Sequence, residues 1–164
     1  MDKVIIETKL TLADFTKVNY ILLFQKISTK ILLLVVLLMI VLPVFLAIRG
    51  MSYNWLQSVI GIVLAAFYLF SARLGAKRNF ESTPAISGLL RYEFTNDRLA
   101  CTGEAAFSQT TWNKVYRVSE TKECILIWKS SQLVNVLPKR DISVSQRVAI
   151  KKMLLLNKVK NSLK

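Results

Sequence analysis

Two long apolar stretches, separated by a connection of six residues, constrain this chain more than any other feature. The first, residues 31–48, contains neither a charged nor a hydrogen-bonding side chain. A helix of this length extends about 27 Å at roughly 1.5 Å per residue, close to the thickness of the hydrocarbon core of a bilayer. Because such a helix has no polar face to present to water, this stretch predicts a membrane-spanning helix.

The second stretch, residues 55–74, is less apolar, since polar side chains and a glycine interrupt it. Gly61 and Ala65 lie four residues apart, and small side chains at this spacing let two helix backbones approach each other in a membrane. The alternative is that the pair is incidental in an apolar helix. We expect a transmembrane hairpin over residues 31–74, with Gly61 and Ala65 as candidate packing residues.

A buried helical hairpin in a soluble core and a secretory signal are the alternatives to two spans. A chain of 164 residues could hardly bury two such helices. The first apolar stretch is also longer than the hydrophobic region of a typical signal, and no small-residue cleavage site follows it. Both alternatives are therefore disfavoured.

Basic residues flank the hairpin unequally. The connection from 49 to 54 carries one cation, Arg49, and the outer flanks carry six, namely Lys17, Lys26, Lys30, Arg73, Lys77 and Arg78. Because cytoplasmic flanks of membrane spans are enriched in Lys and Arg, we expect a multi-pass protein of the cell (inner) membrane with both termini in the cytoplasm.

The whole chain is strongly basic, with 23 basic and 10 acidic residues and a net charge of +13. In a membrane protein this excess predicts contact with anionic lipids of the inner leaflet. A nucleic-acid partner is the competing interpretation. It is disfavoured because the charge is spread along the chain and no recognition helix or RNP-type aromatic motif is present.

The sequence contains no histidine, which excludes Ser-His-Asp and Cys-His triads and imidazole zinc sites. Cys101 and Cys124 lie too far apart for a metal motif, and we expect both to be reduced, small buried side chains. The acidic residues form no paired motif, and there is no glycine-rich phosphate loop. We expect no catalytic, cofactor-binding or metal-binding residues, and an unrecognised membrane enzyme is a distant alternative.

The residues outside the hairpin are enough for one small domain. In residues 1–30, Val4–Leu10 predicts a strand, and Thr11 with Asp14 three residues later predicts the start of an amphipathic helix. In residues 75–164, a polar connector at 76–88 leads into short strands and a helix over 143–160. The predicted strands are 90–95, 99–102, 107–112, 115–119, 124–129 and 133–137. This spacing indicates an antiparallel sheet or small barrel.

Short motifs in this order resemble the YcxB-like proteins of bacteria, a family of small membrane proteins. The motifs are Leu10–Phe15 with Asn19, Tyr92–Thr95, Trp112–Val115, Ile125–Trp128 and Leu137–Arg140, closed by a helix. The resemblance implies an α+β membrane protein whose cytoplasmic antiparallel sheet domain has a pleckstrin-homology-like architecture with a C-terminal helix. It carries over no catalytic residue.

Candidate contact residues lie near the end of the chain. Trp112 is either a core anchor or an exposed aromatic at a ligand groove. Lys139 and Arg140 follow a predicted strand and could bind a lipid phosphate, or they form a solvated turn. Lys151 and Lys152 lie on the basic C-terminal helix, whose cations either meet the leaflet or form an indifferent polar face.

These observations predict a non-catalytic integral membrane protein that acts as a tethered binding or scaffold module. Its expected partners are the bilayer, anionic lipid head groups, or a membrane or cytoplasmic protein. The alternative is an immunity or regulatory subunit that pairs its spans with another membrane protein.

Overall fold

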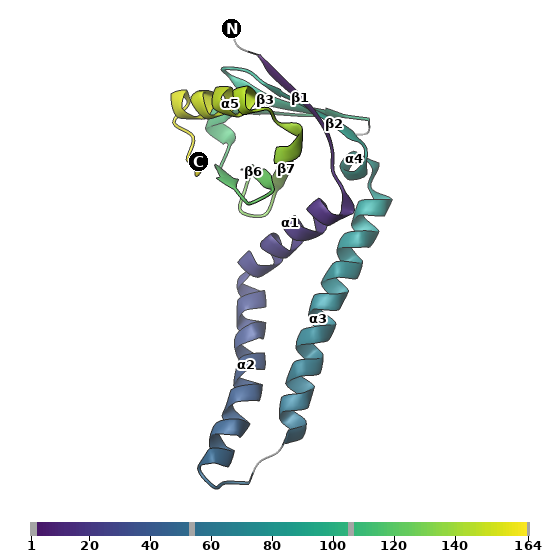
Figure 1. Ribbon diagram of the computed structural model, residues 1–164, viewed down its shortest axis with the longest axis vertical. Coiled ribbons are helices and arrows are strands. Elements are labelled where there is room, and N and C mark those ends of the chain that lie inside the picture. The colour runs from purple at the N-terminus through teal and green to yellow at the C-terminus, as the bar shows by residue number, and fades with distance from the viewer. Residues whose placement is uncertain (1–2, 53–54, 105–106, 164) are drawn as a thin grey trace. The chain divides into compact units, whose positions relative to one another are not determined.

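The structure, a computed structural model, describes residues 3–52, 55–104 and 107–163. The chain forms two compact units, and Figure 1 labels most of their helices and strands. The helical unit is Thr16–Arg78, and the mixed unit combines Met1–Phe15 with Asn79–Lys164. The mixed unit is thus built from both ends of the chain, and the helical unit is inserted between them.

The helical unit contains most of α1 (Leu12–Gln25), all of α2 (Ile27–Ile48) and most of α3 (Trp55–Ser82). Helices α2 and α3 are long and apolar enough to cross a membrane, and only 11% of the residues in each apolar window are buried. The core helix of a soluble protein would be mostly buried. Both helices instead expose large aliphatic and aromatic side chains along their length.

The helices extend beyond the predicted spans. Helix α2 begins at Ile27, four residues before the apolar run, after Lys26 adopts an extended conformation. Helix α3 continues to Ser82, and a short helix α4 (Pro84–Ser87) follows it, so the predicted connector at 76–88 is mostly helical. Residues 76–82 contain neither glycine nor proline, and polarity alone does not end a helix.

Gly61 is a packing residue between α2 and α3. A Cβ atom added to Gly61 would lie 3.3 Å from the Cβ of Met39 and 3.6 Å from the carbonyl oxygen of Val36. Gly61 is buried and Ala65, one turn further along, is half-buried. A hydrogen bond of 2.8 Å between the hydroxyls of Thr29 and Tyr68 also joins the two helices. Gly61 therefore contributes to packing within the hairpin itself.

We expect Gly61→Val to destabilise the hairpin by about 1–3 kcal/mol, because the added atoms meet side chains and backbone of α2. Gly75→Ala, on the same helix, is the matched control. A Cβ at Gly75 meets nothing within 4 Å, and alanine favours a helix by up to about 1 kcal/mol over glycine. Thermal unfolding of both variants in detergent measures the difference. Equal unfolding temperatures would contradict the assigned packing.

The described residues of the mixed unit form two antiparallel sheets and a terminal helix. The first has the order β1-β2-β3-β4 and the second the order β5-β6-β7. The strands are β1 (Val4–Lys9), β2 (Leu89–Phe94), β3 (Arg98–Gly103), β4 (Phe107–Thr111), β5 (Arg117–Glu120), β6 (Cys124–Trp128) and β7 (Val134–Pro138). The short helical elements are η1 (Trp112–Lys114) and η2 (Lys139–Asp141), and α5 (Val144–Leu156) is the last helix. The predicted antiparallel sheet is confirmed, divided into two sheets.

Strands β1 and β2 pair directly although the helical unit separates them in sequence. Their register runs from Val4 opposite Phe94 to Lys9 opposite Leu89. Since the last residue of β1 faces the first residue of β2, the chain leaves the sheet and returns to it at the same end. Both connections to the hairpin therefore start at the same end of this strand pair.

Large buried side chains join the two sheets. The Tyr92 hydroxyl donates a hydrogen bond of 3.2 Å to the carbonyl oxygen of Val136, which links β2 to β7. Trp112 is 3% exposed, and its indole nitrogen donates to the Thr95 carbonyl oxygen at 2.9 Å. Trp112 is therefore a core anchor, which is the first of the two interpretations given for it above.

Both cysteines are free thiols, and Cys124 is buried while Cys101 is half-buried.

Helix α5 has a defined start and an earlier end than predicted. The Ser143 hydroxyl accepts a hydrogen bond from the Gln146 backbone at 3.2 Å, and the Gln146 side chain accepts one from the Ser143 backbone at 2.9 Å. This capping box fixes the N-terminus. The helix stops at Leu156, because Lys158 adopts a positive φ of 53°. The following residues turn back, and Asn161 forms a bridge with Val118 in β5.

Candidate functional site

The start of α1 is organised by a reciprocal cap. The Thr11 hydroxyl accepts a hydrogen bond from the Asp14 backbone at 3.2 Å, and the Asp14 carboxylate accepts one from the Thr11 backbone at 3.0 Å. These bonds satisfy two donors that the first turn of a helix otherwise leaves unpaired. The predicted helix start at Thr11 is confirmed.

Arg140 binds the same Asp14 carboxylate. It lies in η2, far from Asp14 in the sequence. Its Nη1 lies 3.1 Å from Oδ1 of Asp14 and its Nη2 lies 2.8 Å from Oδ2. Nη2 also donates to the carbonyl oxygen of Lys9 at 3.1 Å. The Asp14 side chain is 5% exposed, whereas that of Arg140 is 46% exposed. The fork of the guanidinium thus makes a bidentate ion pair whose acidic side is buried.

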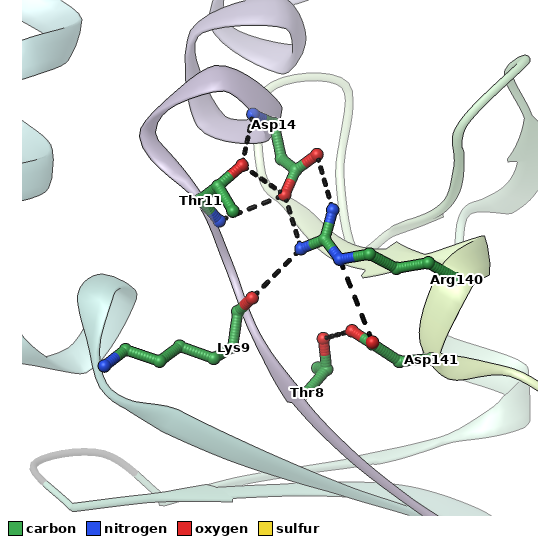
Figure 2. A network of polar contacts seen from close by, with 6 residues as sticks. All are labelled: Thr8, Lys9, Thr11, Asp14, Arg140 and Asp141. Carbon is green, nitrogen blue, oxygen red and sulfur yellow. Dashed lines mark hydrogen bonds and ion pairs between the residues drawn. The ribbon is translucent and has the colours of Figure 1, made fainter.

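Asp141 completes the cluster from the neighbouring position. Its carboxylate accepts a hydrogen bond from the Thr8 hydroxyl and lies 3.8 Å from Nε of Arg140. We refer to the six residues drawn in Figure 2 as the junction cluster: Thr8, Lys9, Thr11, Asp14, Arg140 and Asp141. The contacts of this cluster hold η2 against the end of β1 and the first turn of α1. From α1 the chain continues to the hairpin.

The electrostatics of the cluster favour the charged forms. Burial raises the pKa of the Asp14 carboxyl, but hydrogen bonds from Arg140 and Thr11 outweigh burial and lower it from 3.8 to about 2. The hydrogen bond to Asp14 in turn raises the pKa of Arg140. Both groups are therefore charged at neutral pH, and the cluster is a fixed structural contact at that pH.

The lowered pKa of Asp14 predicts acid sensitivity. The folded state holds this carboxylate ionised more strongly than the unfolded chain does, so its contribution to stability is complete above about pH 4 and is lost as the pH falls through about 2. Over this range we expect the free energy of unfolding to fall up to about 1.4 kcal/mol per pH unit more steeply than in Asp14→Asn. Urea unfolding at a series of pH values measures both slopes, and parallel slopes would contradict the assignment.

A second carboxylate, Glu120 at the end of β5, pairs with two cations. Its Oε1 lies 2.5 Å from Nζ of Lys139 and also contacts Nη2 of Arg147 in α5. Nζ of Lys139 donates as well to the carbonyl oxygen of Lys122 at 3.4 Å. The Glu120 side chain is 9% exposed, so this contact holds α5 and η2 against β5.

The predicted contact residues therefore fall into two groups. Lys139 and Arg140 each have a carboxylate partner within the domain. Neither is therefore a simple solvated turn residue. Lys152 is exposed and Lys151 is half-buried on α5, and within the described part of the chain neither forms an ion pair.

The comparisons with known proteins concern the mixed unit. Residues 94–154 match the family model for YcxB-like proteins. This segment is YcxB-like. It begins at the last residue of β2 and ends within α5, so it contains Arg140 and Glu120, whereas Asp14 lies outside it. No curated protein matches the chain. No solved structure matches it either.

The YcxB-like segment alone could not have revealed the junction cluster. Asp14 and Arg140 are 126 positions apart, and a single sequence does not show which of its charged residues meet. The one available signal was the position of Asp14 in a capping box, which explains the acid locally and leaves no reason to seek a second partner.

Proposed function

We propose that this protein is a two-span integral membrane protein whose non-catalytic domain acts at the cytoplasmic face of the cell membrane. One observation carries the proposal: an apolar helical hairpin with exposed side chains is inserted between two strands that pair with each other. The hairpin serves as the anchor. The domain supplies the binding surface.

Membrane insertion is supported by the exposed surface of α2 and α3. In water, contiguous exposure of large apolar side chains on two helices would cause aggregation. In a bilayer the same surface is favourable, since the backbone polar groups are satisfied within each helix. Pro43 lies inside α2, and spanning helices tolerate proline because neighbouring groups can satisfy the carbonyl that it frees.

The charge distribution supports the orientation. The helical unit contains seven basic residues and no acidic residue, and Arg49 alone lies at the α2–α3 connection. The other six lie towards the ends of the hairpin that are joined to the mixed unit. Under the positive-inside rule, those ends, the mixed unit and both termini belong in the cytoplasm.

The arrangement of four strands, three strands and a final helix supports a pleckstrin-homology-like domain. In this proposal, the hairpin occupies the connection between the first two strands. The YcxB-like segment then comprises most of the domain, with β1 and the greater part of β2 contributed from outside it.

Crosslinking in native membranes tests the proposed function. The full-length protein would be crosslinked, purified and analysed by mass spectrometry for bound proteins and lipids. We expect anionic lipids to be enriched relative to the bulk membrane. A stoichiometric membrane protein without lipid enrichment would leave the two-span anchor intact, but it would overturn lipid as the bound partner and favour a regulatory or immunity subunit. Such a partner would contact the outward faces of the hairpin, since Gly61 packs against α2.

A further inference from the structure

Helix α5 presents two apolar faces, of which the domain covers one. Ile150, Met153 and Leu154 are at most 3% exposed and pack in the core. On the opposite side, Val144 is 82% exposed and Val148 is 63% exposed. Leu155 is 62% exposed. An amphipathic helix that only covered a sheet would carry polar residues at these outer positions.

The outer positions form one continuous stripe. Val148 lies four residues after Val144, and Leu155 lies seven residues after Val148, spacings that return to the same helical face. Lys151 and Lys152 flank the three apolar side chains on either side. Helix α5 contains no acidic residue. We call these five residues the α5 outer face: Val144, Val148, Lys151, Lys152 and Leu155.

We propose that the α5 outer face docks on the anionic lipid surface of the leaflet to which the protein is anchored. The aliphatic side chains enter the region between head groups and acyl chains, and the lysines bind lipid phosphates, as in other interfacial helices. This inference rests on the proposed function and names the surface through which the domain contacts lipid. The α5 outer face does not include Lys139 and Arg140, which are paired within the domain.

Charge and size favour lipid over a second copy of the chain. Two copies of this face would bring lysines together without a carboxylate to pair with them. Three aliphatic side chains are also few beside the roughly 20–30 residues per partner of a standard protein interface. An anionic lipid surface, in contrast, complements both lysines. Because the hairpin tethers the domain covalently to the membrane, the effective concentration of lipid around the domain is high. A small contact then suffices for docking.

A fluorescent probe on the α5 outer face tests this inference in the full-length protein. A polarity-sensitive label is attached at Val148→Cys in a Cys101→Ala background, leaving only the buried Cys124. The protein is reconstituted into vesicles of phosphatidylcholine, with or without phosphatidylglycerol, that carry a nitroxide quencher near the head groups. The matched control places the label at Gln109→Cys, an exposed position on β4.

We expect quenching and a blue shift of the Val148→Cys probe in the anionic vesicles, and neither change at Gln109→Cys. Adding Lys151→Glu and Lys152→Glu should reduce the quenching by about twofold or more, because both cations that attract the anionic surface are removed. The same signal in neutral and anionic vesicles, or no quenching in either, would overturn the inference.

Alkaline extraction of the same vesicles separates this inference from the proposed function. Protein that stays in the vesicles while its Val148→Cys probe remains in water overturns the docking of α5 and leaves the membrane anchor intact. Protein released into the supernatant overturns the proposed function, and the docking of α5 with it.

Discussion

Replacing Arg140 with alanine should lower the free energy of unfolding of the mixed unit by about 2–3 kcal/mol. The change leaves the Asp14 carboxylate, which is 5% exposed, without its main counter-charge. Breaking a fully buried ion pair costs about 3–5 kcal/mol, and surface pairs contribute about 0–1 kcal/mol. The half-exposed guanidinium of Arg140 places this pair between those limits.

Arg91→Ala provides the matched control, because Arg91 lies 4.0 Å from Glu7 and both side chains are more than half exposed. Guanidinium unfolding followed by tryptophan fluorescence measures both variants, and a Trp55→Phe background confines the signal to Trp112 and Trp128. We expect Arg91→Ala to lose less than about 1 kcal/mol. If Arg140→Ala loses no more than this control, the junction cluster does not stabilise the domain.

The double variant Leu38→Arg with Val41→Arg should abolish stable membrane integration. Both side chains are about half exposed near the middle of α2, at 54% and 51%. An arginine at the centre of a span costs about 2.5–3.5 kcal/mol, so two cost about 6 kcal/mol. The apolar side chains of residues 31–48 favour insertion by about 5–9 kcal/mol in total. The two charges therefore cancel most of this gain.

Position along the helix supplies the control. Ile31 and Ile48 are also exposed, at 56% and 80%, but they lie at the two ends of the apolar run. Arginines there can extend to the interface, so Ile31→Arg with Ile48→Arg should remain membrane-bound after alkaline extraction. If the central and terminal pairs behave alike, the hairpin does not span a bilayer. In a soluble protein, exposed arginines at all four positions would be harmless.

Local patterns in the sequence were sufficient for most elements of this fold. Alternation between apolar and polar residues gave strands such as β2, which buries every second residue, and a continuous apolar run gave β6, whose five residues are all buried. Thr11 with Asp14 marked a helix start through side-chain chemistry that acts within one turn. These signals depend only on neighbours in sequence, so one sequence contains them.

Element ends and the candidate site depended on contacts that sequence patterns do not carry. Helix α3 continues past its apolar residues, because helix formers do not stop at a change of polarity. The partners of Lys139 and Arg140 are Glu120 and Asp14. Because only the fold brings these residues together, nothing in the sequence indicated that either cation has a carboxylate partner within the domain. The exposed apolar stripe on α5 became visible only when its buried face was known.

The most direct test of this account is the topology of the hairpin. Single cysteines are introduced at Met51→Cys, in the α2–α3 connection, and at Ser162→Cys, after α5, in the Cys101→Ala background. Intact spheroplasts are then treated with a membrane-impermeant maleimide. We expect labelling at Met51→Cys in intact spheroplasts and at Ser162→Cys only after permeabilisation. Equal labelling of both sites before permeabilisation, or the reverse pattern, would contradict a two-span anchor with a cytoplasmic domain.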